Sequence, residues 1–120
     1  MAKTILVVDD SPSEVKLIVS TLKDKGYNLV VATDGEEALE RAIQHRPDLV
    51  VLDVVLPKRN GFQVCRQLKT APDSAKTKVI MVSSKSQDSD RFWGLKQGAD
   101  AYLTKPLDPA ELISTVAKNL

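Results

Sequence analysis

Five short apolar runs alternate along the chain with segments in which apolar residues recur at helical spacing. The runs are rich in β-branched residues and are the predicted strands: Thr4–Val8, Leu29–Ala32, Leu49–Leu52, Val79–Val82 and Ala101–Leu103. The first four are nearly continuous in valine, isoleucine and leucine. A strand with one wet face would alternate apolar and polar residues, so these runs predict strands buried on both faces, as in a parallel sheet covered by helices.

Helix start signals stand between the predicted strands. Ser11 can act as an N-cap, Pro12 suits the first turn, and Glu14 is placed to complete a capping box. Asp34 and Asp108 precede two further helices in the same way. Apolar residues then recur at helical spacing in all three segments: Val15, Ile18, Val19 and Leu22; Ala38, Leu39, Ala42 and Ile43; Leu112, Ile113, Val116, Ala117 and Leu120.

Two more helices are predicted over about 61–70 and 86–97. In the first we expect an inward face formed by Val64, Cys65 and Leu68. In the second we expect Phe92 and Leu95 to point inward and Trp93 to lie at the edge of that face, partly exposed. Gly94 weakens this helix, because an interior glycine costs about 1 kcal/mol relative to alanine.

Five strand–helix units in one chain predict an α/β fold. Right-handed crossovers lead to a doubly wound parallel sheet with the flavodoxin-like order 2-1-3-4-5 and five helices, in a single domain over residues 1–120. In such sheets ligands bind at the carboxyl ends of the strands, at the switch point between strands 1 and 3.

Composition narrows the functional classes. With 17 Lys and Arg against 16 Asp and Glu, the net charge of +1 offers no basic excess for a nucleic-acid backbone. No apolar run approaches the roughly 18 residues that would span a bilayer, and the amino terminus has no secretory signal pattern. The single cysteine, Cys65, fits a reducing compartment. We therefore expect a cytoplasmic protein that neither binds nucleic acid nor inserts in a membrane.

Polar residues follow the predicted strands at the edge where ligands bind. Asp9 and Asp10 end the first strand, Asp53 ends the third, Ser83 ends the fourth and Lys105 follows the fifth. Three carboxylates brought together repel one another unless cations lie among them. Oxygen ligands without histidine or cysteine favour a hard ion, and few carboxylates beside a phosphoryl group favour Mg²⁺ over Ca²⁺.

Four motifs at these strand ends resemble those of the response-regulator receiver domain, in the CheY-like superfamily. They are Val7-Val8-Asp9-Asp10-Ser11; Leu52-Asp53-Val54-Val55-Leu56-Pro57 with Asn60-Gly61; Met81-Val82-Ser83-Ser84; and Gly98-Ala99-Asp100-Ala101-Tyr102-Leu103-Thr104-Lys105-Pro106. The resemblance covers essentially the full chain. The stretch from Arg91 to Ala99 is further similar to stand-alone receivers of the PilH and PilG kind, which serve chemotaxis-like systems controlling type IV pili.

The resemblance implies a role for each residue of the cluster. Asp53 would accept a phosphoryl group from a phosphohistidine of a histidine kinase. Asp9 and Asp10 would hold Mg²⁺ together with Asp53 and the backbone carbonyl of Val55, because the cation offsets the repulsion between two anions. Lys105 would supply a second positive charge, and its bond to the following proline is cis in this family.

The resemblance also implies a conformational switch. The Ser83 hydroxyl would bind another phosphoryl oxygen, and Tyr102 would turn inward as Ser83 moves. The surface made by helix 4, strand 5 and helix 5 would then act on a downstream protein. Because Trp93 is expected to be partly exposed on this surface, we expect it to contact that partner; the alternative is that its ring folds over Gly94 and Gln97 and only shields backbone. Ser83 replaces the more frequent threonine, and Val55 and Lys85 stand at positions that vary among relatives, which leaves the dephosphorylation rate open.

Other functions remain as alternatives. An FMN-binding flavodoxin shares the fold, but Asp9 and Asp10 would repel its phosphate. A phosphatase that turns over an aspartyl-phosphate would need a second acid where Val55 stands, so we expect no enzymatic activity beyond self-phosphorylation and dephosphorylation. A phosphate sink and an unphosphorylated scaffold also remain. No output domain follows the last helix, so we expect a stand-alone monomer, or a weak phosphorylation-dependent dimer, that acts by docking.

Overall fold

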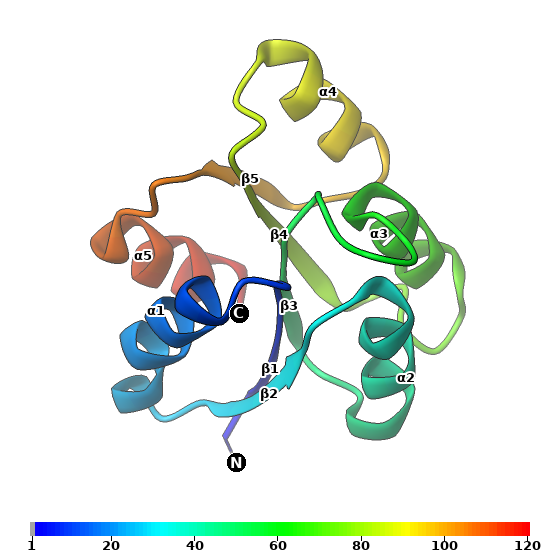
Figure 1. The fold of residues 1–120 in the computed structure, drawn as a ribbon. Coiled ribbons are helices and arrows are strands. Elements are labelled where there is room, and N and C mark those ends of the chain that lie inside the picture. Colours follow the sequence, from blue (N-terminus) through cyan, green and yellow to red (C-terminus); the bar gives the residue numbers. More distant parts are fainter. Residues whose placement is uncertain (1) are drawn as a thin grey trace.

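Five parallel strands form one sheet in the order β2-β1-β3-β4-β5 in the computed structural model, which describes residues 2–120. Helices cover both faces of the sheet (Figure 1). The strands are β1 (Thr4–Val8), β2 (Asn28–Ala32), β3 (Leu49–Leu52), β4 (Lys78–Ser83) and β5 (Ala101–Thr104). The helices are α1 (Pro12–Leu22), the short 3₁₀ helix η1 (Lys23–Lys25), α2 (Gly35–His45), α3 (Gly61–Thr70), α4 (Asp88–Lys96) and α5 (Pro109–Asn119). The predicted fold class and strand order are confirmed.

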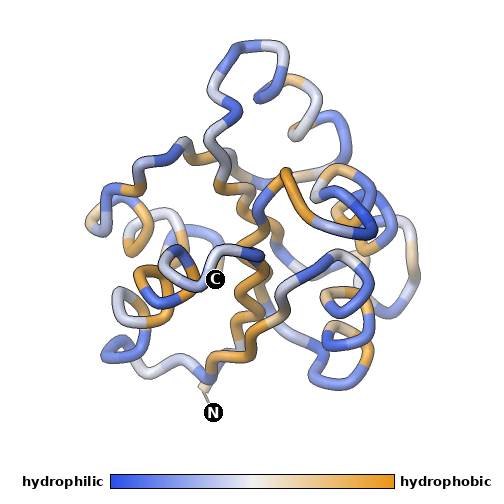
Figure 2. The backbone as a smooth tube through the Cα atoms, in the orientation of Figure 1, coloured by the Kyte–Doolittle hydropathy of each residue, from blue (hydrophilic) through white to orange (hydrophobic). Residues whose placement is uncertain are grey.

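The strands divide their side chains between two cores. Leu6 and Val8 of β1 belong to the core on the side of α2 and α3, and Ile5 and Val7 belong to the core on the side of α1 and α5. This alternation follows from the two-residue period of a strand, and it explains why the runs are apolar at every position. Figure 2 shows the hydrophobic residues gathered along the strands, with the hydrophilic ones outside.

The start of α1 differs from the predicted capping box. The Ser11 hydroxyl accepts only a long bond, 3.5 Å, from the Glu14 amide. The Ser11 amide, which the Glu14 carboxylate was expected to bind, instead donates to Asp9 Oδ1 at 2.9 Å. The capping-box prediction for Glu14 is therefore wrong, because a better-placed carboxylate already takes the same amide.

The inward face of α4 also differs from the prediction. Phe92 and Leu95 are 62% and 52% exposed, so the expectation that they point inward is wrong. The buried residue of this helix is Gly94, where an added Cβ would lie 2.9 Å from both Met81 Sδ and Tyr102 Cδ2. A bare glycine lets α4 approach the sheet closely, which turns its larger side chains outward. Trp93 is 53% exposed, as predicted.

Candidate functional site

Two buried aspartates lie at the carboxyl ends of neighbouring strands. Asp9 follows β1 and Asp53 follows β3, and these strands pair in parallel up to Val8 and Leu52. Only 1% of Asp9 and 6% of Asp53 is exposed. The Asp53 amide donates to the Val8 carbonyl, so the sheet hydrogen bonding itself sets the two acids beside each other.

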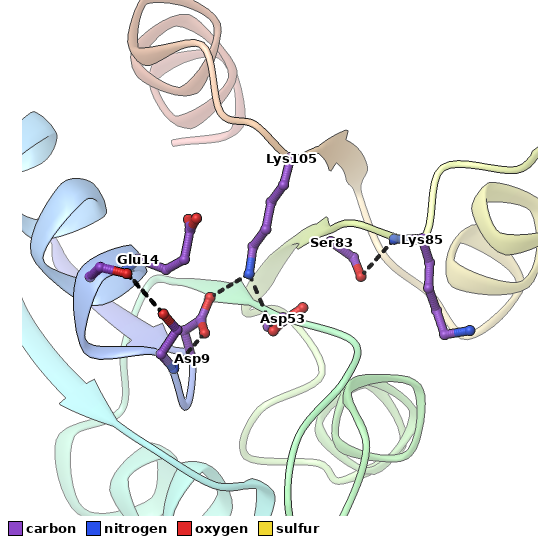
Figure 3. A network of polar contacts seen from close by, with 8 residues as sticks. Asp9, Glu14, Asp53, Ser83, Lys85 and Lys105 are labelled. Atoms are coloured by element: carbon purple, nitrogen blue, oxygen red, sulfur yellow. Dashed lines mark hydrogen bonds and ion pairs between the residues drawn. The ribbon is translucent and has the colours of Figure 1, made fainter.

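Lys105 joins the two buried carboxylates. Its ammonium lies 2.8 Å from Asp9 Oδ2 and 3.3 Å from Asp53 Oδ2. The Lys105 amide donates to the Ser83 carbonyl, which ties the segment after β5 to the end of β4. Figure 3 shows the side chain pointing between the two aspartates. The bond from Lys105 to Pro106 is cis, as the family resemblance implied.

Burial and neighbouring charges set the electrostatics of the cluster. Burial raises the pKa of Asp53 and the Asp9 charge raises it further, while Lys105 and the Val55 backbone offset part of this effect. Burial alone would lower the pKa of Lys105, but its hydrogen bond to Asp9 and the charge of Asp53 outweigh burial and raise it. The raised pKa makes the Asp53 carboxylate more basic, and the lysine keeps its positive charge beside it.

A third carboxylate makes the cluster suitable for a hard divalent cation. Asp10 is exposed, yet one of its oxygens and one from each of Asp9 and Asp53 all lie within 4.8 Å of one another. All three donors are oxygens, which suits Mg²⁺ by ligand type. Val55 has a 54% exposed side chain, and the role of its carbonyl as a further ligand stays a prediction.

A hydrogen-bonded link connects Ser83 to Tyr102. The fully buried Ser83 accepts from the Lys85 amide at 3.2 Å, and the Tyr102 hydroxyl donates to the Lys85 carbonyl at 2.7 Å. Burial raises the pKa of Tyr102, which is 6% exposed and therefore already turned inward. One backbone unit thus joins the two predicted switch residues. The Lys85 side chain itself points away from Asp53 (Figure 3).

A family model of the response regulator receiver domain matches residues 5–117 of the chain. The chain belongs to this family. As a receiver domain of a response regulator, it is a component of two-component signalling. None of the helices within the described residues 2–120 is both long and apolar enough to cross a bilayer.

Known proteins resemble this receiver domain over nearly all of its length. It is 45% identical over 97% of the chain to the alkaline phosphatase synthesis transcriptional regulatory protein PhoP of Bacillus subtilis, of which it spans 48%, about half the length. It is 41% identical to Protein PilH of Pseudomonas aeruginosa, and the match covers 93% of both chains. The chemotaxis response regulator CheY4 of Vibrio cholerae has a TM-score of 0.93, 31% identity and full coverage of both chains.

The structure brings most of the predicted site residues of the receiver domain together. Asp9, Asp10, Asp53 and Lys105 form one cluster. Trp93 lies apart on the outer side of α4, in keeping with a role at a surface rather than in the chemistry. Sequence reasoning missed the backbone of Lys85 as the link between Ser83 and Tyr102, because backbone hydrogen bonds in a loop leave no side-chain signal.

Proposed function

We propose that this receiver domain accepts a phosphoryl group from a histidine kinase onto Asp53, with Mg²⁺, and thereby controls a downstream protein. The observation that carries the proposal is the lysine ammonium bridging the buried Asp9 and Asp53 while Asp10 offers a third carboxylate oxygen within 4.8 Å. A purely structural ion pair would not need a third acid. An acceptor of an anionic group needs both a nucleophile and a surplus of ligands for cations.

Asp9, Asp10 and Asp53 would hold the metal, together with the Val55 carbonyl. When bound there, Mg²⁺ supplies charge neutralisation between the aspartate and the incoming phosphoryl group. The carboxylates converge from two loops that follow β1 and β3, so the sheet rather than the ion fixes their spacing. This placement keeps the ligands in position before a cation binds.

In the transfer, an oxygen of Asp53 attacks the phosphorus atom of the donor. The new O–P bond forms as the N–P bond to the donor imidazole breaks, and the imidazole nitrogen keeps the electron pair of that bond. Lys105 pairs with Asp53 before the reaction and with a phosphoryl oxygen afterwards. The product is an acyl phosphate on Asp53. Because no acid stands where Val55 is, we propose that the protein does not turn over phosphate as an enzyme.

Phosphorylation would be read out through Ser83 and Tyr102. The Ser83 hydroxyl would donate to a phosphoryl oxygen, and its bond from the Lys85 amide would pass this movement to the loop that holds the Tyr102 hydroxyl. The loop leads directly into α4. The surface of α4, β5 and α5 would therefore change its affinity for a partner as the charge on Asp53 changes.

The similarity to PilH supports a pathway in pilus-based motility or taxis, because that match covers 93% of both chains. In this role the protein would be cytoplasmic and would meet a kinase and a downstream target. A phosphate sink is the alternative, since it needs the same acceptor chemistry without a target. The presence of all three acids and the lysine favours a signalling regulator or a phosphate sink over an unphosphorylated scaffold.

Acetyl phosphate labelling of the Asp53→Asn variant tests the proposal. We expect the native protein to gain one phosphoryl group in Mg²⁺ by mass spectrometry, and the variant to gain none, because an amide is not a nucleophile for this reaction. EDTA should abolish labelling of the native protein. Asp73→Asn, which removes an exposed acid elsewhere, is the matched control and should label normally. Equal labelling of Asp53→Asn would remove Asp53 from its role.

A further inference from the structure

The buried ring of Tyr102 is fixed at its polar end and on one face. Its hydroxyl donates to the Lys85 carbonyl at 2.7 Å. The ring also lies against Gly94 of α4, where an added Cβ would be 2.9 Å from Tyr102 Cδ2 and 3.1 Å from Cε2. The ring therefore occupies space that a side chain on α4 would otherwise fill, and its inward position depends on this helix.

Arg91 of the same helix contacts Tyr102 at two further points. Its Nη1 donates to the Tyr102 carbonyl at 3.3 Å, and its Cζ lies 5.8 Å from the centroid of the ring. Arg91 precedes Gly94 by three residues, so the two lie on adjacent turns of α4 and approach Tyr102 together. Arg91 is an exposed residue, yet its guanidinium reaches the backbone of a buried strand residue.

These contacts stabilise the inward orientation of Tyr102 that the structure shows. A guanidinium within about 6 Å of a ring attracts it, and at an exposed site the attraction changes a population by about two- to fivefold. The hydrogen bond to the Tyr102 carbonyl adds to this effect, since it fixes the guanidinium near the residue whose ring it attracts. The bond to the Lys85 carbonyl and the 5.8 Å approach of Arg91 are both contacts of the inward ring.

We propose that Arg91 is a positioning residue that holds Tyr102 inward and so sets the resting balance of the switch. The Lys85 backbone contacts both Tyr102 and Ser83, so a change in the position of the ring would move the Ser83 hydroxyl, which is expected to bind the phosphoryl group. Arg91 thus favours the arrangement that accepts an anion on Asp53. This last step rests on the proposed function, whereas the position of Tyr102 in the resting protein does not.

Fluorine NMR of the resting protein tests the first step. A Tyr27→Phe background labelled with meta-fluorotyrosine leaves Tyr102 as the only reporter, because the chain has two tyrosines. Arg91→Met should move the resonance toward that of fluorotyrosine in water, and Arg91→Lys, which keeps a cation, should move it less. Lys96→Met is the matched control, since that lysine is on the same helix but lies 5.5 Å from the Phe92 ring instead. An unmoved resonance in Arg91→Met, or an equal movement in Lys96→Met, would overturn the proposal.

Titration with beryllofluoride in Mg²⁺, a phosphoryl mimic, tests the second step. The fluorescence of Trp93, the single tryptophan, follows binding. Arg91→Met should need about two- to fivefold more beryllofluoride for half-saturation than Lys96→Met. Equal half-saturation in the two variants would overturn the link to the site. If the parent protein itself bound no beryllofluoride, the proposed function would fail, while the NMR comparison would still decide the role of Arg91 in the resting state.

Discussion

The side chain two residues after Asp53 is apolar and in contact with solvent. Val55 is 54% exposed, and it offers no hydrogen bond to a water that would attack an acyl phosphate in line. Lys85, the other residue at a variable position, points its side chain away from Asp53 and offers no carboxylate to accept a proton from that water. We therefore expect a long-lived phosphorylated state.

Polar substitutions at these two positions should shorten that lifetime. We expect the double variant Val55→Asn with Lys85→Glu to release inorganic phosphate roughly tenfold faster than the native protein in saturating Mg²⁺. Ile43→Asn with Lys118→Glu makes the same kinds of change on exposed residues of α2 and α5, and it should release phosphate at the native rate. A slower release from the first variant would refute the argument from side-chain polarity.

The buried thiol of Cys65 gives a prediction for alkaline pH. Burial raises its pKa from the ordinary value of 9.0 to about 11, and its sulfur donates to the Gln97 carbonyl at 3.6 Å. As pH rises, the Cys65 thiol ionises first in the unfolded chain. The contribution of the protonated thiol to the free energy of unfolding is therefore fully present below pH 9.0 and is lost between pH 9.0 and about 11. By pH 10 the loss should reach about 1.4 kcal/mol.

Urea unfolding of the native protein and Cys65→Ala at pH 8, 9 and 10 measures this loss. The variant should show a flatter dependence on pH, whatever its absolute stability. Lys105 and Tyr102 are present in both proteins, so their own dependence on pH cancels in the difference between the two curves. Parallel curves would show that the thiol does not ionise differently in the folded and unfolded chains.

At the scale of elements, α4 packs closely against the sheet at Gly94 and leaves its large apolar side chains exposed to solvent. Phe92, Trp93 and Leu95 are each more than half exposed. A tryptophan in such a place can anchor a partner, and removing an anchor costs about 2 kcal/mol or more of binding. We expect Trp93→Ala to weaken docking of the downstream partner about 30-fold and to leave acetyl phosphate labelling of Asp53 unchanged.

Isothermal titration with a partner isolated by cross-linking to the beryllofluoride form measures the change in affinity. Leu120→Ala removes a partly exposed apolar side chain beyond α5 and serves as the comparison. Native affinity in Trp93→Ala, or loss of labelling together with the fold, would place Trp93 among the structural residues.

Most elements could be predicted from the sequence, because buried parallel strands and capped helices each have a strong local pattern. The range predicted for α3 was correct to the residue, although its actual capping box, formed by Asn60 and Gln63, went unnoticed. The face of α4 could not be predicted in this way. Gly94 is buried there because a sheet residue, Tyr102, fills the space beside it, and no pattern within the helix contains that fact.

The sequence predicted more of the candidate site than of the side-chain packing around it. Asp9, Asp53 and Lys105 each follow a strand, so strand order alone was enough to bring them together. The contacts of Lys85 and Arg91 depend on a loop path and a side-chain direction. No repeating pattern of residues in the sequence indicates a loop path or a side-chain direction, so these contacts are seen only in the structure.

At the scale of the whole molecule, three carboxylates lie close together with one lysine, and a cation bound among them would offset their mutual repulsion. Mg²⁺ that binds only the folded state at a hundred times its Kd should stabilise the protein by about 2.7 kcal/mol, which is about 10 °C in Tm. Asp10→Asn should raise Tm in EDTA by removing repulsion, and it should lose most of the response to Mg²⁺. Thermal unfolding with and without the ion measures both effects.

The control for this experiment is Asp73→Asn, which lies outside the carboxylate cluster. This variant should keep the native response to Mg²⁺. A native response in Asp10→Asn as well would show that Asp10 is not a ligand. A lower Tm of Asp10→Asn in EDTA would show that the three acids do not repel one another in the folded protein.

The lysine that joins Asp9 to Asp53 also has a consequence for synthesis of the protein. Lys105 comes 96 residues after the first aspartate and 52 residues after the second. At translation rates of about 5–20 residues per second, it leaves the ribosome roughly 3–10 s after Asp53. A nascent chain in that interval has its acceptor carboxylate but lacks the cation that receives the phosphoryl oxygen. On the proposed mechanism, a nascent chain that has not yet exposed Lys105 therefore draws no phosphoryl group from the kinase.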